Sequence, residues 1–297
     1  MKIILTGSLG NISLPLTKQL IQKGHQVTVI SSRPEKQKDI EALGASAAIG
    51  SVEDISFLTA IFREAETVYC MIPPNYWFNG VDPLEYYQLV GNNYAAAIRQ
   101  SGIKRVIHLS SFGAELDKGT GFILGAHHVE NILDQLPGVA ITHVRPTSFY
   151  NNLFGFVGMI KGAGYIATNY GGEDMLVLVS PRDIASAIVE EVEASPEHRK
   201  IRYVASDELT GNEVASILGA AIGKPDLKWV VTTNEQTQTA LEAAGMSRII
   251  ASNMVELNAC IHSGELAKDY FRNRPKELGK TKLTSFAKEF ALAFNEK

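Results

Sequence analysis

Apolar residues along the first half of the chain alternate between two spacings, one typical of buried strands and one typical of amphipathic helices. The runs that predict strands cover residues 2–5, 26–31, 45–50, 67–72, 105–111 and 139–146. The stretches that predict helices cover residues 11–24, 34–44, 55–65, 83–101 and 125–136. Strands that alternate with helices of this length predict right-handed βαβ units. We therefore expect an α/β fold with a doubly wound parallel sheet that is buried on both faces.

The pattern changes after about residue 147, where apolar residues are interrupted by glycines. The later predicted elements are strands at 175–180, 201–206 and 226–233 and helices at 181–194 and 210–224. The last of these helices starts with a T-x-x-E capping box, Thr210 to Glu213, and the remainder is mostly helical. We predict one domain over residues 1–150, completed by strand 201–206, and a smaller, mostly helical C-terminal lobe over residues 151–297.

Composition and charge exclude several classes of protein. Of the 297 residues, 45% are hydrophobic and 20% are charged, which is ordinary globular usage, and the net charge of −4 gives no basic surface for nucleic acid. No apolar run approaches the roughly 18 residues of a membrane span, and polar residues interrupt the N-terminal apolar trio before a signal-peptide core could form. Cys70 and Cys260 make neither a disulfide framework nor a metal-ligand spacing. We expect a cytoplasmic protein without metal, membrane or direct nucleic-acid binding, and the oligomeric state stays open.

The segment LTGSLGNIS (5–13) joins the first predicted strand to the first predicted helix. In this position Gly7 would allow a tight turn, and Gly10 would let the backbone approach a pyrophosphate whose oxygens accept hydrogen bonds from the helix N-terminus. Ser13 stands where a third glycine would favour close packing of helix and strand. The context favours a dinucleotide-binding loop, and an ordinary strand-to-helix turn is the alternative.

The end of the second predicted strand indicates which dinucleotide would bind. A carboxylate at this point would accept the ribose 2′-hydroxyl of NAD, whereas this chain has Arg33 and then Lys36. Their positive charges suit a 2′-phosphate. The sequence therefore favours NADP(H) over NAD(H), and the alternative is that both side chains are solvated at the start of a helix.

Motifs along nearly the whole chain resemble the NmrA-like family of atypical short-chain dehydrogenase/reductases, which are NAD(P)-binding proteins with a Rossmann fold. The resembling segments are TGSLGNIS, SRPEK, MIPP, HLSSFGA, VRPTSFYNNL, SPRDIASAIV and NRPKELGKTKLTSFAKEFA. The glycine loop, the charges after strand two and this resemblance together imply one set of cofactor-binding residues. They are Thr6, Gly7, Leu9, Gly10, Asn11, Ile12, Arg33, Lys36, Ile72, Pro73, Pro74, Ser110, Ser111 and Pro146.

The chain departs from the wider superfamily at the catalytic pair. Reductases of that superfamily carry a Tyr and a Lys four residues apart on the helix after strand five, where the tyrosine donates a proton and the lysine holds the ribose. Counting back from Glu130, these two positions are Phe122 and Ala126 here. Neither side chain can move a proton, so the usual acid–base machinery is absent.

Other residues near this helix are weak candidates for the missing proton donor. His127 or His128 could act near neutral pH, although surface histidines beside an apolar stripe are the simpler interpretation. Tyr150 lies in the segment that would border the nicotinamide. Ser110 and Ser111 suit hydrogen bonds to the nicotinamide ribose or its amide better than a nucleophilic role.

Aromatic residues lie after strand four of the predicted sheet, where a doubly wound fold opens its ligand crevice, and in the chain beyond residue 148. They could wall an apolar substrate pocket, or they could pack a loop against the C-terminal lobe. These residues are Tyr76, Trp77, Phe78, Phe149, Tyr150 and Tyr170.

Two functions follow from these features. One is an NADPH-dependent reductase of a small apolar substrate such as a quinone or another conjugated carbonyl compound, because a quinone accepts hydride readily and can take its proton from water. The other is a non-catalytic NADP(H)-sensing regulatory protein that acts through a protein partner. The missing Tyr–Lys pair favours the second function and the aromatic residues favour the first, and a fold alone does not decide between them.

Overall fold

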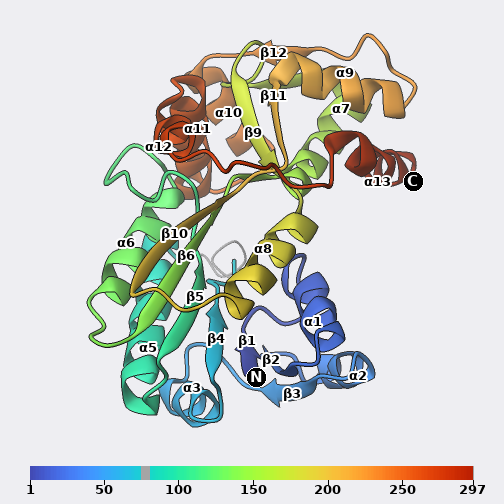
Figure 1. Cartoon of the computed structure of the whole chain (residues 1–297). Helices are drawn as coiled ribbons and strands as arrows, with labels where there is room; N and C mark the ends of the chain where they lie inside the picture. The colour runs from blue at the N-terminus through green and yellow to red at the C-terminus, as the bar shows by residue number, and fades with distance from the viewer. Residues whose placement is uncertain (75–80, 297) are drawn as a thin grey trace. The chain divides into compact units, whose positions relative to one another are not determined.

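The structure is a computed structural model that describes residues 1–74 and 81–296, and it divides into two compact units (Figure 1). Unit 1 comprises Met1–Ala114, Gly125–Arg145 and Ile184–Arg202. Unit 2 comprises Glu115–Leu124, Pro146–Asp183 and Tyr203–Lys297. The division is interleaved in sequence, because the chain returns to unit 1 over Ile184–Arg202. The division into a domain over residues 1–150, completed by strand 201–206, and a lobe over residues 151–297 stays a prediction.

The seven-stranded sheet has the order β10-β6-β5-β4-β1-β2-β3. Its strands are β1 (Lys2–Leu5), β2 (Gln26–Ser31), β3 (Ser46–Ile49), β4 (Thr67–Cys70), β5 (Arg105–Leu109), β6 (Ala140–Pro146) and β10 (Arg199–Val204). The pairs β1–β2, β2–β3, β1–β4, β4–β5 and β5–β6 are all parallel. The strand order reverses direction between β1 and β4, which is the switch point where such sheets bind ligands. The doubly wound parallel sheet predicted from the sequence is confirmed.

Helices cover both faces of the sheet in unit 1 (Figure 1). The helices that connect its strands are α1 (Ser13–Gln22), α2 (Gln37–Ala42) after the 3-10 turn η1 (Pro34–Lys36), α3 (Ile55–Phe62), α5 (Pro83–Ser101), α6 (Ile123–Asp134) and α8 (Pro181–Glu193). Helices α3, α5 and α6 lie on one face, and α1 and α2 lie on the other. Local sequence sets the ends of α5, because the Asp82 side chain accepts hydrogen bonds from two backbone N–H groups and Gly102 adopts φ 78° at the C-cap.

Unit 2 contains two small sheets as well as the expected helices. Its three-stranded sheet has the order β11-β9-β7, with β7 (Ser148–Phe149), β9 (Met175–Val179) and β11 (Asp207–Thr210). Its two-stranded sheet pairs β8 (Ile166–Thr168) with β12 (Trp229–Val231). Its helices are η2 (Tyr150–Phe156), α7 (Val157–Ala163), α9 (Gly211–Ala221), α10 (Asn234–Ala243), α11 (Arg248–His262), η3 (Glu265–Ala267), α12 (Lys268–Arg272) and α13 (Leu283–Asn295). The predicted capping box is confirmed at the start of α9, where Thr210 and Glu213 exchange hydrogen bonds.

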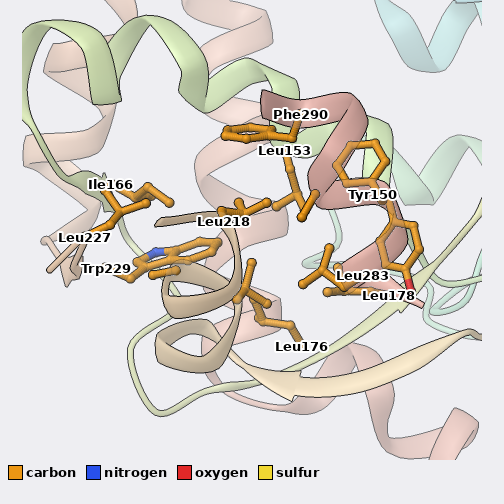
Figure 2. Close-up of a cluster of buried hydrophobic side chains, with 14 of the residues drawn as sticks. Tyr150, Leu153, Ile166, Leu176, Leu178, Leu218, Leu227, Trp229, Leu283 and Phe290 are labelled. Atoms are coloured by element: carbon orange, nitrogen blue, oxygen red, sulfur yellow. The ribbon is translucent and has the colours of Figure 1, made fainter. Parts of the chain in front are cut away.

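A continuous apolar core holds unit 2 together, as Figure 2 shows. Residues from η2, α9, α13 and the small sheets meet there, including Leu153, Leu218 and the fully buried Phe290. The indole N–H of Trp229 donates hydrogen bonds to the Thr168 hydroxyl (2.8 Å) and to a backbone carbonyl (2.7 Å), so this large side chain is buried with its polar group paired.

Residues 1–74 and 81–296 contain neither a membrane-spanning helix nor a metal-binding cluster. Within these ranges, no helix has both the length and the apolar character that a membrane crossing requires. No group of three or more His, Cys, Asp or Glu side chains in this part of the chain could hold a metal ion. Cys70 and Cys260 are both buried free thiols.

Candidate functional site

The loop after β1 makes a tight turn that depends on glycine. Gly7 has φ +92°, and a Cβ at this position would lie 2.8 Å from the Ser13 Oγ and 3.0 Å from the Met71 side chain. Ser8 also adopts the left-handed region, with φ 53°, and the Gly10 N–H donates to the Gly7 carbonyl at 3.2 Å. A side chain at position 7 would be both strained and obstructed, so glycine is required there.

Ser13, which replaces the third glycine of the motif, ties the helix to the strand. Its buried hydroxyl donates to the Thr6 carbonyl at 3.0 Å. The Thr6 hydroxyl in turn accepts a hydrogen bond from the Met71 N–H at 2.9 Å, and the Tyr94 hydroxyl donates to the Met71 carbonyl at 2.6 Å. The loop after β1 and the segment after β4 are therefore fixed to each other by a part-buried hydrogen bond.

The start of α1 offers unpaired donors that fit a phosphate group. Among the described residues, the backbone N–H groups of Leu9, Asn11 and Ile12 donate to no acceptor in the protein. Helix α1 has no capping side chain at Ile12 and no acidic residue in its first turn. N–H groups at a helix N-terminus bind phosphate oxygens without further help. The loop thus has the geometry and the donors that a dinucleotide pyrophosphate requires.

The end of β2 is joined to the glycine loop by a pair of serines that the sequence motifs do not reveal. The Ser8 hydroxyl donates to the Ser31 hydroxyl at 3.0 Å, and the Ser31 oxygen also accepts from the Arg33 N–H at 3.2 Å. The Arg33 side chain is exposed, whereas Lys36 forms an ion pair with Asp39 at 2.9 Å. Because Asp39 offsets the charge of Lys36, Arg33 is the stronger anion-binding group of the two.

The segment after β4 carries the prolines expected beside a cofactor. Ile72 is buried, Pro73 is half-buried and Pro74 is exposed, so the burial decreases along this segment. The predicted aromatic cluster Tyr76, Trp77 and Phe78 lies outside the described residues.

Ser110, directly after β5, belongs to a buried polar group. Its hydroxyl donates to Glu130 Oε1 at 2.5 Å, and Arg145 donates to both oxygens of Glu130, at 2.9 Å to Oε1 and 2.6 Å to Oε2. Ser111 is half-buried, and Pro146 ends β6. Glu130 and Arg145 were not among the predicted site residues. Charged residues inside the otherwise apolar stretches VENIL and AITHVRP were the signal that could have indicated them.

The two positions of the missing catalytic pair are filled by buried apolar side chains. Phe122 is 8% exposed and Ala126 is 5% exposed. That neither position supplies a proton stays a prediction from the sequence.

The two histidines of α6 differ in their surroundings. His127 Nδ1 donates to the Ala114 carbonyl at 2.9 Å, and its Nε2 accepts a hydrogen bond from Asn131 at 2.9 Å. Both ring nitrogens of His127 are therefore engaged in holding the local structure. His128 is half-exposed, and partial burial followed by the neighbouring His127 lowers its pKa. A catalytic role for either histidine stays a prediction.

The remaining candidates lie in unit 2. The buried Tyr150 hydroxyl contacts Asp207 Oδ2 at 2.6 Å and the Thr281 carbonyl at 3.1 Å, and burial followed by the bond to Asp207 raises the pKa of Tyr150. Tyr150 belongs to the core of unit 2, Tyr170 packs against that core, and Phe149 is half-buried in β7. These contacts account for the burial of Tyr150 and Tyr170 without a substrate, and their role in a substrate pocket stays a prediction.

Comparisons with known proteins agree with this architecture. The model of the NmrA-like family matches residues 1–260. No curated protein sequence matches the chain. The fold is similar to that of triphenylmethane reductase from Citrobacter sp., solved in complex with NADP(H), with TM-score 0.80 and 20% identity over 97% of this chain and 99% of that one.

Two further solved structures share the fold. One is the NADPH-dependent quinone oxidoreductase QOR2 from Escherichia coli, complexed with NADPH, with TM-score 0.74 and 17% identity over 97% of this chain and 99% of that chain. The other is NmrA, a negative transcriptional regulator, in complex with NADP, with TM-score 0.67 and 13% identity over 97% of this chain and 90% of that chain. At these identities the likeness concerns the fold, and the site must be judged on its own residues.

Proposed function

The chain belongs to the NmrA-like family, and we propose that it binds NADP(H) and transfers hydride from it to a quinone or another conjugated carbonyl compound. The observation that carries the proposal is the loop after β1, where three N–H groups without an acceptor in the described part of the chain and the left-handed Gly7 form a cradle for a pyrophosphate. Arg33, exposed at the end of β2, supplies the positive charge for a 2′-phosphate.

Each part of the site has a distinct task in this proposal. Leu9, Asn11 and Ile12 bind the pyrophosphate through their backbone N–H groups. Thr6 and Tyr94 hold the segment after β4 in place through Met71. The reduced nicotinamide supplies a hydride when it is bound, and conversion of a quinone to a hydroquinone then needs one proton.

The source of that proton distinguishes this site from that of a tyrosine-dependent reductase. Phe122 and Ala126 have no proton to give, and the Tyr150 hydroxyl contacts a carboxylate and a carbonyl oxygen. A hydroquinone anion is a stable enough product to take its proton from water. A quinone is therefore the class of substrate whose reduction depends least on a proton from a Tyr–Lys pair. The reductase and quinone oxidoreductase with the same fold support this choice.

The test is a turnover measurement with purified protein, NADPH and a panel of quinones, followed by the absorbance of the reduced nicotinamide. We expect oxidation of NADPH that depends on the quinone and on the protein. Tight binding of NADPH with no turnover of any quinone would refute the reductase.

Cofactor choice has its own test. Arg33→Ala should weaken NADPH binding by about 10- to 100-fold, because a hydrogen bond to a charged group contributes about 1.5–3 kcal/mol, and should leave NADH binding nearly unchanged. Lys38→Ala is the matched control, since it removes an exposed positive charge from the same segment. Equal losses for NADPH and NADH in the Arg33 variant would contradict the assignment of the 2′-phosphate.

A second candidate is an NADP(H)-sensing regulator without catalysis. The absent Tyr–Lys pair favours it, and NmrA shows that a regulator can have this fold. Binding titrations with NADPH and NADP⁺ would test it, because a sensor of the nicotinamide ratio must distinguish the two. Equal affinities for both forms would exclude this role.

A further inference from the structure

A buried ion pair lies directly behind the serine at the end of β5. Arg145 of β6 and Glu130 of α6 have side chains only 4% and 9% exposed, and two hydrogen bonds join them. Ser110 is 8% exposed, and its hydroxyl donates to Glu130 Oε1 at 2.5 Å. All three residues lie in the layer formed by β5, β6 and α6.

The charges of the pair determine the direction of the serine hydrogen bond. An arginine is always protonated, and its fork-shaped guanidinium binds a carboxylate through two parallel bonds. A carboxylate has no hydrogen to donate. The hydrogen of the Ser110 hydroxyl must therefore point to Glu130.

Toward a ligand, Ser110 can act only as a hydrogen-bond acceptor. A hydroxyl has one hydrogen and two lone pairs, and the single hydrogen of Ser110 is used inside the protein. Ser110 cannot donate to a carbonyl oxygen of a substrate, but it can accept a hydrogen bond from an N–H or O–H group. Its place at the carboxyl end of β5 is where a doubly wound sheet binds its ligand.

We propose that Glu130 and Arg145 are positioning residues that make Ser110 an obligate hydrogen-bond acceptor for a donor on the nicotinamide riboside half of the cofactor. The donor is the carboxamide NH₂ or a ribose hydroxyl. This inference rests on the proposed binding of NADP(H). It also narrows the substrate class, because a carbonyl substrate would receive no polarising hydrogen bond from this serine.

The first experiment measures ligand affinities of the wild type and of Ser110→Ala, which leaves the ion pair intact. The ligands are NADP⁺, its 3-acetylpyridine analogue, 2′-phospho-ADP-ribose and adenosine 2′,5′-bisphosphate. The analogue keeps a carbonyl acceptor but lacks the NH₂ donor, and the bisphosphate lacks the whole riboside half. Ser110→Ala should weaken NADP⁺ binding about fivefold, the contribution of one hydrogen bond, and leave the bisphosphate unchanged. Ser111→Ala is the matched control.

The other two ligands identify the donor. If Ser110→Ala also weakens 2′-phospho-ADP-ribose, the donor is a ribose hydroxyl. If the loss occurs only with NADP⁺ and not with the acetylpyridine analogue, the donor is the carboxamide. Unchanged NADP⁺ affinity in Ser110→Ala, or an equal loss for the bisphosphate, would overturn the inference while leaving the proposed function standing. Absence of NADP⁺ binding in the wild type would overturn both.

The second experiment removes the carboxylate that accepts the hydrogen bond from the Ser110 hydroxyl. Replacing the ion pair as a whole, in the double variant Glu130→Met with Arg145→Met, avoids leaving one buried charge unpaired, and such replacements are often tolerated. The Ser110 hydroxyl could then donate as well as accept. If the carboxamide is the donor, the wild-type preference for NADP⁺ over the acetylpyridine analogue should disappear in this variant. If a ribose hydroxyl is the donor, that variant should bind NADP⁺ and 2′-phospho-ADP-ribose with equally reduced affinity, because the Ser110 lone pairs are no longer held toward the ligand. A variant whose ligand affinities and preference equal those of the wild type would show that the pair is only structural.

Discussion

Acid should destabilise this protein through His108, a histidine buried inside the seven-stranded sheet. His108 in β5 is 1% exposed and stands opposite His143 in β6. The Nδ1 atoms of the two rings are 3.0 Å apart, and His143 Nε2 lies 3.1 Å from Asp134 Oδ1. The two Nδ1 atoms are close enough to share one hydrogen, and the tautomers of the rings decide which of them donates it.

The pKa of His108 is held well below its usual value, first by burial and then by the neighbouring His143 and Arg145. In the unfolded chain this histidine has a pKa of about 6.5 and therefore binds a proton below that pH, whereas in the folded protein it stays neutral. The free energy of unfolding must fall as the pH drops below that value, and above it this contribution is fully present. Between about pH 7.5 and about pH 5.5 the loss from this one group is about 1.4 kcal/mol.

The assay is urea unfolding of the wild type and of His108→Asn at both pH values. The asparagine side chain cannot be protonated, and its amide has both a donor and an acceptor to offer His143 Nδ1. The variant is expected to be less stable throughout because it is smaller, but its stability should fall by about 1.4 kcal/mol less between the two pH values. An identical fall in both proteins would refute the argument, because His108 would then bind its proton equally well in both states.

Three further substitutions test the loop and unit 2. Gly7→Ala should weaken NADPH binding more than tenfold in a fluorescence titration, because its Cβ would lie 2.8 Å from a serine hydroxyl. Gly24→Ala is the control, since Gly24 has φ +81° but no atom within 4 Å of the added Cβ. This variant should lose only about 1 kcal/mol of stability and keep its affinity for NADPH. Tyr150→Phe should lower the free energy of unfolding by about 1–2 kcal/mol with kcat unchanged, and a large loss of kcat would instead identify it as the proton donor. Phe290→Ala should cost about 3–5 kcal/mol in denaturant unfolding, since this side chain is fully buried, and a cost below about 1 kcal/mol would contradict the packing.

Much of the candidate site follows from the amino-acid sequence. The glycine loop between the first strand and helix, Arg33 after the second strand and the missing pair at Phe122 and Ala126 are all local features of the chain. The role of Ser13 was not predictable, because its hydroxyl bonds to Thr6, and the conformation of the loop between them sets that distance.

The ends of the strands were also predicted less well than their positions. The pattern extends strand four to residue 72 and strand five to residue 111, whereas the structure ends them at Cys70 and Leu109. After strand four the apolar run continues with Met71 and Ile72, whereas strand five is followed by Ser110, whose N–H still donates to the Val144 carbonyl of β6. The residues after each strand, Met71 and Ser110, turn instead to contacts that support the site.

The sequence by itself determined the order of strands and helices in unit 1, the glycine-containing loop after the first strand and the apolar residues Phe122 and Ala126. Each of these features depends on residues that lie a few positions apart in the sequence, where the periods of strands and helices can be recognised. Only the tertiary structure decided that Glu130, Arg145 and Ser110 form one buried group, and that Ser8 reaches Ser31. Such partners lie on different elements, and the strand order and register of the folded sheet bring them within hydrogen-bond distance.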